Sequence, residues 1–253
     1  MILDKFKLDG KTALVTGASK GLGYAMAAAL AEAGANVANA CIGDGENLRK
    51  AVQKIGRKYF YIKADFSNPS IASDIVEKVT NSLGEIDILV NNAGIIRRAP
   101  ITEFTEKDWD DVINVNLKST FLLSQAVAKK MLKRNCGGKI INIASLLSFQ
   151  GGIRVPSYTA AKSAVMGLTR LMANELAQHN INVNAIAPGY MATDNTAALR
   201  EDAKRSSEIL SRIPAGKWGQ PEDLMGVVVF LASDASAYVN GYTIAVDGGW
   251  LAR

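Results

Sequence analysis

The sequence contains one histidine, His179, and two cysteines, Cys41 and Cys136, among 253 residues. One histidine excludes a metal site with several imidazole ligands, and a Ser-His-Asp triad would have to use His179. His179 follows the expected end of a long helix, which favours a structural role. Two isolated cysteines are typical of a reduced cytoplasmic protein rather than of a disulfide framework. We therefore expect no metal, and acid–base chemistry near neutral pH must come from other side chains.

Long apolar runs are also missing. Segments without charge are interrupted by Gly, Pro, Asn or Gln, which predicts that no helix spans a membrane. The N-terminus, MILDKFKLDGK, has no apolar signal-peptide core, so we expect a cytoplasmic protein. The net charge is +5, but basic residues are dispersed among acidic ones. Because they form no basic stripe, we do not expect nucleic-acid binding. The mild positive excess suits a small anionic substrate or cofactor.

Short apolar runs alternate with longer amphipathic segments along the chain. The expected strands are Thr12–Thr16, Asn36–Cys41, Tyr59–Ala64, Ile86–Asn91, Lys139–Ser145, Asn182–Ala187 and Tyr242–Asp247. One helix is expected between the first glycine turn and Gly34. The others are Asn47–Ile55, Ser70–Leu83, Asp108–Arg134, Ser157–Gln178, Asn195–Arg212 and Pro221–Ala232. This alternation predicts an α/β fold with a mainly parallel sheet and helices on both faces. Because no linker interrupts it, we expect one domain over residues 1–253.

The first expected strand runs directly into the sequence TGASKGLG, residues 16–23. Glycines at positions 17, 21 and 23 allow a tight turn and let the backbone approach a pyrophosphate at a helix N-terminus. A glycine-rich turn alone is a weak signal, but its place between a strand and a helix strengthens it. The segment predicts a dinucleotide-binding loop.

Polar or turn-forming residues follow four further expected strands. They are Asp65-Phe66, NNAG at 91–94, Ser145 and PGYMAT at 188–193. In an open parallel sheet the ligand lies outside the carboxyl ends of the strands. We therefore expect these four segments to line one site.

Tyr158 and Lys162 are four residues apart in an expected helix and so lie on one face of it. A free tyrosine titrates near about 10, and a neighbouring ammonium favours the phenolate. Such a tyrosine can act as general acid or base towards an alcohol or carbonyl oxygen. Ser145 could donate a hydrogen bond to the same oxygen. The pair alone is more typical of a helix surface, but with Ser145 and the glycine loop it indicates a proton-transfer site.

These motifs, with the segment INVNL around Asn116, resemble the short-chain dehydrogenase/reductase family over essentially the whole chain. The resemblance implies a doubly wound Rossmann fold of seven strands in the order 3-2-1-4-5-6-7, NAD(P)-dependent hydride transfer and a homotetramer. It also implies a catalytic tetrad of Asn116, Ser145, Tyr158 and Lys162. Tyr158 would exchange the proton and Ser145 would orient the substrate oxygen. Lys162 would tune Tyr158 and bond the nicotinamide ribose, and Asn116 would hold a water of a proton relay.

The resemblance also assigns cofactor contacts. Asp65 would meet the adenine amine, residues 91–94 the adenosine ribose, and Thr193 the carboxamide. The expected cofactor-binding residues are Gly17, Ser19, Lys20, Gly21, Leu22, Gly23, Asp65, Phe66, Asn92, Ala93, Gly94, Tyr158, Lys162, Pro188, Gly189, Met191 and Thr193.

The residue that ends the second strand bears on the choice between NAD(H) and NADP(H). Members that prefer NAD usually have an acidic residue there to bind the ribose hydroxyl, but this chain has Cys41. No Arg follows that could hold a 2′-phosphate. Lys20 could bind that phosphate, whereas Asp44 could repel it. The sequence favours NAD(H) and leaves NADP(H) open.

The segments around NNAG, Ser145, Tyr158 and PGYMAT also resemble family members that oxidise or reduce keto-deoxy sugar acids in uronate breakdown. Those members interconvert 2-dehydro-3-deoxy-D-gluconate and 3-deoxy-D-glycero-2,5-hexodiulosonate. Such a substrate carries a carboxylate, which a guanidinium binds well. The candidates for this cation are Arg154 and Arg97, and Tyr190 could cover the substrate. Each of the three could equally have a surface or packing role.

Three alternatives stay open at this point. Two are enzymes of the same family, a gluconate 5-dehydrogenase and a 3-oxoacyl-carrier-protein reductase. The third is a dinucleotide-sensing protein without catalytic activity. Fold and catalytic groups alone do not fix the substrate.

Overall fold

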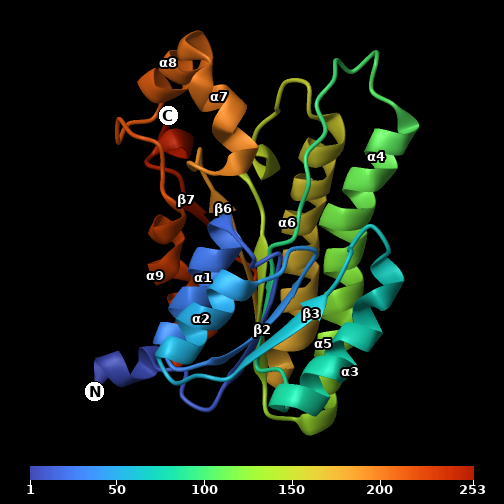
Figure 1. Cartoon of the computed structure of the whole chain (residues 1–253), viewed down its shortest axis with the longest axis vertical. Helices are drawn as coiled ribbons and strands as arrows, with labels where there is room; N and C mark the ends of the chain where they lie inside the picture. The colour runs from blue at the N-terminus through green and yellow to red at the C-terminus, as the bar shows by residue number, and fades with distance from the viewer.

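Seven strands form one parallel sheet at the centre of the computed structural model, which describes all 253 residues (Figure 1). Their order is β3-β2-β1-β4-β5-β6-β7, which confirms the expected doubly wound topology. The strands are β1 Thr12–Thr16, β2 Asn36–Cys41, β3 Tyr59–Lys63, β4 Ile88–Asn91, β5 Gly138–Ile143, β6 Ile181–Pro188 and β7 Thr243–Val246.

Helices cover both faces of this sheet (Figure 1). α1, α2 and α9 lie on one face, and α3, α4, α5 and α6 lie on the other. α7 and α8 lie beyond the carboxyl ends of the strands, at the top of the view. The helices are α1 Gly21–Glu32, α2 Glu46–Lys54, α3 Ala72–Leu83, α4 Glu106–Ile113, α5 Ser119–Arg134, α6 Pro156–Leu176, α7 Ala197–Glu201, α8 Ala203–Arg212 and α9 Met225–Ala232.

Each face of the sheet has its own hydrophobic core of 23 buried residues. All five residues of β1 and all eight of β6 are buried. Central strands of a parallel sheet are covered on both faces, so they form continuous apolar runs instead of alternating patterns. This explains why TALVT stands out in the sequence as a strand.

The position of β1 determines where a ligand can bind. β1 pairs with β2 on one side and with β4 on the other, so the chain reverses its direction of winding at this strand. At such a switch point the loops that leave neighbouring strands diverge and open a crevice. The crevice is expected at the carboxyl ends of β1 and β4.

The helix expected over Asp108–Arg134 is in fact two helices. α4 starts earlier, at Glu106, where the Thr105 hydroxyl accepts a 3.1 Å hydrogen bond from the Asp108 amide. A turn of π-helix, Asn114–Lys118, then separates α4 from α5. Such turns are rare in proteins, and those that occur are often at functional sites. Periodicity could not reveal this one, because inserting one residue hardly changes the apolar pattern.

The helix expected over Asn195–Arg212 is also interrupted. Asp202 has an extended backbone between α7 and α8, and its carboxylate accepts a 3.0 Å bond from the Arg205 amide. An aspartate in this position stabilises a new helix N-terminus rather than continuing the previous helix. The other boundaries differ from expectation by a few residues, and Pro221–Leu224 forms a 3-10 turn before α9. None of the helices has both the length and the apolar composition needed to cross a bilayer.

Candidate active site

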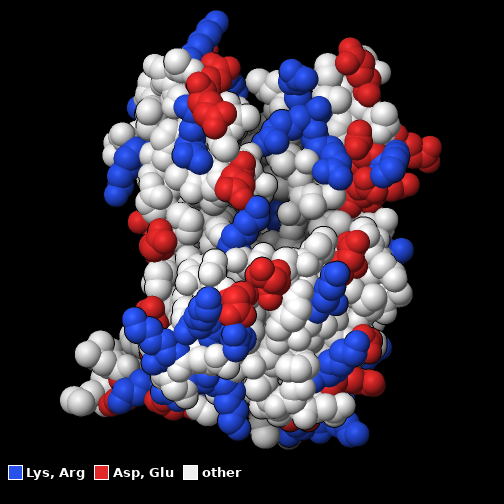
Figure 2. Space-filling model, in the orientation of Figure 1, with Lys and Arg blue, Asp and Glu red and all other residues white.

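A cleft of about 750 Å³ lies at the carboxyl ends of the strands, where the topology predicts it. Figure 2 shows the hollow on this face, with basic and acidic side chains next to each other along its rim. Every expected cofactor residue lines it except three. Gly189 and Met191 line a neighbouring pocket of about 290 Å³, and Pro188 is buried at the end of β6. The cleft therefore contains the glycine loop, residues 65–66 and 92–94, and Thr193 together with Tyr158 and Lys162.

The glycine loop folds tightly between β1 and α1. Gly17 and Gly21 have φ of +66° and +58°, a conformation that other residues adopt only with strain. A Cβ on Gly23 would lie 2.4 Å from both the Asn92 amide nitrogen and the Gly17 carbonyl oxygen. No side chain caps the N-terminus of α1, so its first N–H groups stay available to an anion. This open cradle fits a pyrophosphate.

Asn92 positions the loop rather than the ligand. Its Nδ2 donates to the carbonyls of Thr16 at 2.9 Å and Gly17 at 3.1 Å. The Thr16 hydroxyl in turn accepts from the amides of Asn92 and Ala93, both at 2.9 Å. The preceding Asn91 points into the core, where it bonds Ser124 and Asn142. The main chain of residues 92–94, not the Asn91 side chain, is therefore presented to the cleft.

The wall at the end of β2 is uncharged. Cys41 is buried, its thiol donates to the Gly43 carbonyl at 3.3 Å, and burial raises the pKa of that thiol. A Cβ on Gly43 would lie 2.8 Å from the Ser19 hydroxyl, so the loop after β2 packs directly against the glycine loop. At the mouth of the cleft, Lys20 pairs with Asp194 at 2.5 Å.

Lys162 is buried beside Tyr158. Its side chain is 4% exposed, and its Nζ donates to the Ile143 carbonyl at 2.5 Å. The same Nζ lies 5.7 Å from the centroid of the Tyr158 ring. No carboxylate pairs with this ammonium, and desolvation lowers the pKa of Lys162 to about 8. At neutral pH the group is still mostly protonated.

The pKa of Tyr158 differs from the expectation. Lys162 is expected to lower it, but burial raises the pKa of this phenol above its usual value because the phenolate loses its hydration. The Ser145 hydroxyl and, more weakly, the Arg98 guanidinium act in the opposite direction. Tyr158 is therefore a neutral hydrogen-bond donor at neutral pH.

Asn116 lies in the π-helical turn between α4 and α5 and is 1% exposed. Its Oδ1 accepts from the Ile95 amide at 2.8 Å and its Nδ2 donates to the Ile95 carbonyl at 2.9 Å. Both ends of the amide are thus used to hold the loop after β4. The water-binding role implied for Asn116 stays a prediction.

The three substrate candidates lie in different settings. Arg97 lines the cleft but pairs with Asp108 at 3.4 Å and Asp111 at 3.8 Å. Arg154 is exposed, has φ of +64°, and accepts a bond from the Ala99 amide through its main-chain carbonyl. Tyr190 packs outside the cleft, against two tryptophans of the C-terminal region.

Arg98, which the sequence did not single out, is exposed and contacts Asn195, a residue that lines the cleft. Its Nη2 donates to the Asn195 carbonyl at 3.1 Å, so it connects the loop after β4 with the segment before α7. It is also the charged side chain that lowers the pKa of Tyr158. The only signal in the sequence is the pair Arg97-Arg98 just after NNAG, and nothing there distinguishes the two.

A glycine cradle at a helix N-terminus shares its cleft with a partly buried tyrosine and a buried lysine, and a serine lies next to the tyrosine. This arrangement defines a nicotinamide-dependent oxidoreductase. No group of His, Cys, Asp and Glu side chains suited to a metal is present. The family profile described as Enoyl-(Acyl carrier protein) reductase matches residues 17–251. The chain belongs to the short-chain dehydrogenase/reductase family.

Relatives of known name extend along the whole chain. A protein from Dickeya dadantii (strain 3937), named 2-dehydro-3-deoxy-D-gluconate 5-dehydrogenase, is 62% identical, with 100% of both chains covered. An NADP-bound structure from Agrobacterium tumefaciens is 55% identical, with a TM-score of 0.94 and 99% and 100% of the two chains covered. A gluconate 5-dehydrogenase from Burkholderia cenocepacia J2315, in complex with NADP and tartrate, is 40% identical, with a TM-score of 0.95 and full coverage of both chains.

Proposed function

We propose that this protein interconverts 2-dehydro-3-deoxy-D-gluconate and 3-deoxy-D-glycero-2,5-hexodiulosonate with a nicotinamide cofactor, in uronate breakdown. The observation that carries the reaction class is the Tyr158–Lys162 pair at the end of the dinucleotide cleft. The substrate is supported by the 62% identical relative, which covers the whole chain and carries the corresponding name.

The bound cofactor would accept or supply the hydride, and the chain's own groups would handle the proton and the charge. In the reductive direction, neutral Tyr158 would donate its proton to the substrate oxygen that becomes the hydroxyl. The Ser145 hydroxyl would donate a second hydrogen bond to that oxygen. The ammonium of Lys162 would stabilise the phenolate that Tyr158 becomes, and the oxidative direction reverses these steps.

The proposed cofactor preference is a modest one for NAD(H). The wall near Cys41 has no arginine for a 2′-phosphate, and Lys20 already pairs with Asp194. It also has no carboxylate to reject that phosphate, and the relatives from Agrobacterium and Burkholderia hold NADP. Values of kcat/KM for the two cofactors test this preference, and a much higher value with NADPH would reverse it.

For the substrate carboxylate, Arg98 is the proposed partner. The guanidinium of Arg98 reaches Asn195, which lines the cleft, whereas the charge of Arg97 is already balanced by two aspartates. Arg154 is the second candidate, since its exposed side chain belongs to the loop that leads to Tyr158.

A cytoplasmic homotetramer is the proposed form of the protein. Exposed Trp109, Phe121 and Leu171 lie on α4, α5 and α6, the helices of one face of the sheet. Exposed apolar side chains of this size favour association between copies. The free thiols of Cys41 and Cys136 are consistent with a reducing compartment.

Gluconate 5-dehydrogenase is the second candidate, favoured by the Burkholderia relative at 40% identity. A panel of the 2,5-diketo acid, 5-keto-gluconate and a 3-oxoacyl-carrier-protein thioester, each with NADH and NADPH, separates the enzymes. The 2,5-diketo acid should give the highest kcat/KM. A dinucleotide sensor would turn over none of them.

A further inference from the structure

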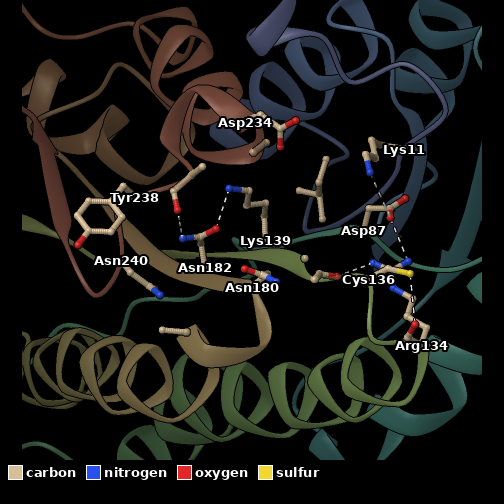
Figure 3. A pocket seen from close by; sticks show the side chains of 16 residues that line it. Lys11, Asp87, Arg134, Cys136, Lys139, Asn180, Asn182, Asp234, Tyr238 and Asn240 are labelled. Carbon is tan, nitrogen blue, oxygen red and sulfur yellow. Dashed lines mark hydrogen bonds and ion pairs between the residues drawn. The ribbon is translucent and has the colours of Figure 1, made fainter.

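A second pocket, of about 620 Å³, opens at the amino-terminal edge of the sheet (Figure 3). Because all seven strands are parallel, this edge is opposite to the one that holds Tyr158. No residue that lines this pocket also lines the cofactor cleft. The pocket therefore has no part in the dehydrogenase reaction.

Lys139 lies at the centre of the pocket (Figure 3). Its Nζ donates to Asn182 Oδ1 on the neighbouring strand β6 at 2.8 Å. The orientation of Asn182 is fixed, because its Nδ2 donates to the carbonyls of Ala237 at 3.0 Å and Val239 at 3.1 Å. An ammonium has three N–H donors, and this one uses a single donor and has no carboxylate within ion-pair distance.

Two further cations lie on one side of the pocket and share one carboxylate. Asp87 Oδ1 is 3.0 Å from Arg134 Nη1 and 4.0 Å from Lys11 Nζ. The other oxygen of Asp87 accepts from the Thr12 amide, so this carboxylate is part of the framework. The Nε of Arg134 is buried and has no partner. The single carboxylate of Asp87 therefore faces two positive charges, those of Arg134 and Lys11.

The charges that face the pocket leave a positive excess. Lys11, Arg134 and Lys139 oppose Asp87 and the exposed Asp234 near its edge. Burial lowers the pKa of Lys139, Asp234 raises it, and Lys11 lowers it to a smaller extent. An anion between Lys139 and Lys11 would offset the lost hydration of Lys139 and the repulsion between the two ammonium groups.

The other side of the pocket offers neutral donors. Asn240 accepts from the Val183 amide through Oδ1 at 2.8 Å, which leaves its NH₂ group without a protein partner. Tyr238, on the same side in Figure 3, is fully exposed. An amide and a phenol next to a cationic centre suit hydroxyl groups adjoining an anionic group.

We propose that this pocket binds a small polyol that carries a phosphate or a carboxylate. The anionic group lies between Lys139 and Lys11, and the hydroxyls face Asn240 and Tyr238. A sugar phosphate and a sugar acid share this chemistry, and binding measurements with each distinguish the two sources.

The test is calorimetric titration of the full-length protein with glucose 6-phosphate, gluconate and uncharged glucose. Saturating NADH is present throughout, so that the pyrophosphate cradle cannot bind the phosphate probe. The variants are Lys139→Met and Lys11→Met, which keep an unbranched side chain one atom shorter and remove one charge each. Lys133→Met, an exposed lysine of α5 outside the pocket, is the matched control.

At least one anion should bind saturably with a Kd in the millimolar range or below. Each pocket variant should weaken it about 10-fold, as expected for loss of one charge-assisted hydrogen bond. Lys133→Met should bind as the wild type does, and glucose should not bind. The proposal is overturned if neither anion binds, if glucose binds equally well, or if both pocket variants retain wild-type affinity. Lys11→Met keeps the test valid should Lys139→Met fail to fold.

Discussion

Burial shifts the pKa values of Tyr158 and Lys162 in opposite directions. Both shifts favour the neutral forms, but with a pKa of about 8 Lys162 keeps its proton at neutral pH. The phenol stays protonated until it meets the substrate oxygen. The unpaired ammonium has no carboxylate to neutralise it, so its charge remains available to the phenolate. The two residues are thus a donor and the group that stabilises its conjugate base.

The pKa of Lys162 makes a prediction about stability. Its folded-state value of about 8 lies below the unfolded value near about 10.4, so the folded protein loses this proton first. The unfolding free energy should therefore rise with pH above 8. Lys162→Met has no titrating group at this position. The unfolding free energy of the wild type should therefore rise by about 2 kcal/mol relative to that of the variant between about pH 7.5 and 9.5. Denaturant unfolding of both proteins measures this, and a pH-independent difference would contradict the assigned shift.

Arg98 and Arg154 make a second prediction at this scale. Arg98→Ala should raise KM for the sugar acid about 10-fold, because one charge-assisted hydrogen bond is lost, and should leave the KM of the cofactor unchanged. Arg154→Ala is the parallel variant. Arg57→Ala is the control, because Arg57 pairs with Asp9 and neither residue lines the cleft. An unchanged KM in Arg98→Ala with a raised one in Arg154→Ala would exchange the two assignments.

At the scale of elements, the strands and their carboxyl ends could be predicted from the sequence. Buried strands such as TALVT are continuous apolar runs, and a parallel sheet brings the segments that follow them to one edge. The π-helical turn at Asn116 could not be predicted, because Asn116 bonds Ile95, which lies far away in the sequence. The break at Asp202 is a local cap, since its carboxylate accepts from the Arg205 amide, but the apolar pattern continues across it and hides it. Arg98 was missed for a similar reason, since the direction of a loop side chain depends on tertiary contacts.

The contact between the glycine loop and the loop after β4 makes a prediction about an element. Gly23→Ala places a methyl group 2.4 Å from the Asn92 amide nitrogen and the Gly17 carbonyl oxygen. Overpacking of this kind costs about 1–3 kcal/mol, and the displaced cradle should bind NAD(H) at least about 10-fold more weakly. Gly226→Ala in α9 meets nothing within 4 Å and should be neutral or slightly stabilising. Thermal melts and cofactor titrations compare the two, and equal behaviour would refute the close contact.

At the scale of the whole molecule, the sheet separates two ligand sites. Strand β5 spans the distance, with Lys139 near its start and Ser145 just after its end. The proposed tetramer associates through the long helices on one face of the sheet. The apolar side chains that stay exposed on α4, α5 and α6 are therefore the surface to perturb.

Leu171→Glu places a charge on that helical face, where the leucine is 52% exposed in the single chain. If copies associate through α5 and α6, the variant should dissociate into smaller species while the fold is kept, because a buried unpaired charge is costly. Ile55→Glu, after α2 on the other face of the sheet, is the matched control. Light scattering gives the masses. A wild-type monomer, or a Leu171→Glu tetramer, would argue against this interface.

The most direct test is the reduction of 3-deoxy-D-glycero-2,5-hexodiulosonate by the wild type and by Tyr158→Phe, with cofactor binding measured on both. The variant removes only the hydroxyl that exchanges the proton. We predict that the wild type reduces this acid efficiently and that kcat of the variant is lower by about 10²–10⁴-fold, with unchanged affinity for the dinucleotide. A wild type that binds the cofactor but does not reduce the acid, or a variant that reduces it as fast as the wild type, would contradict the proposed function.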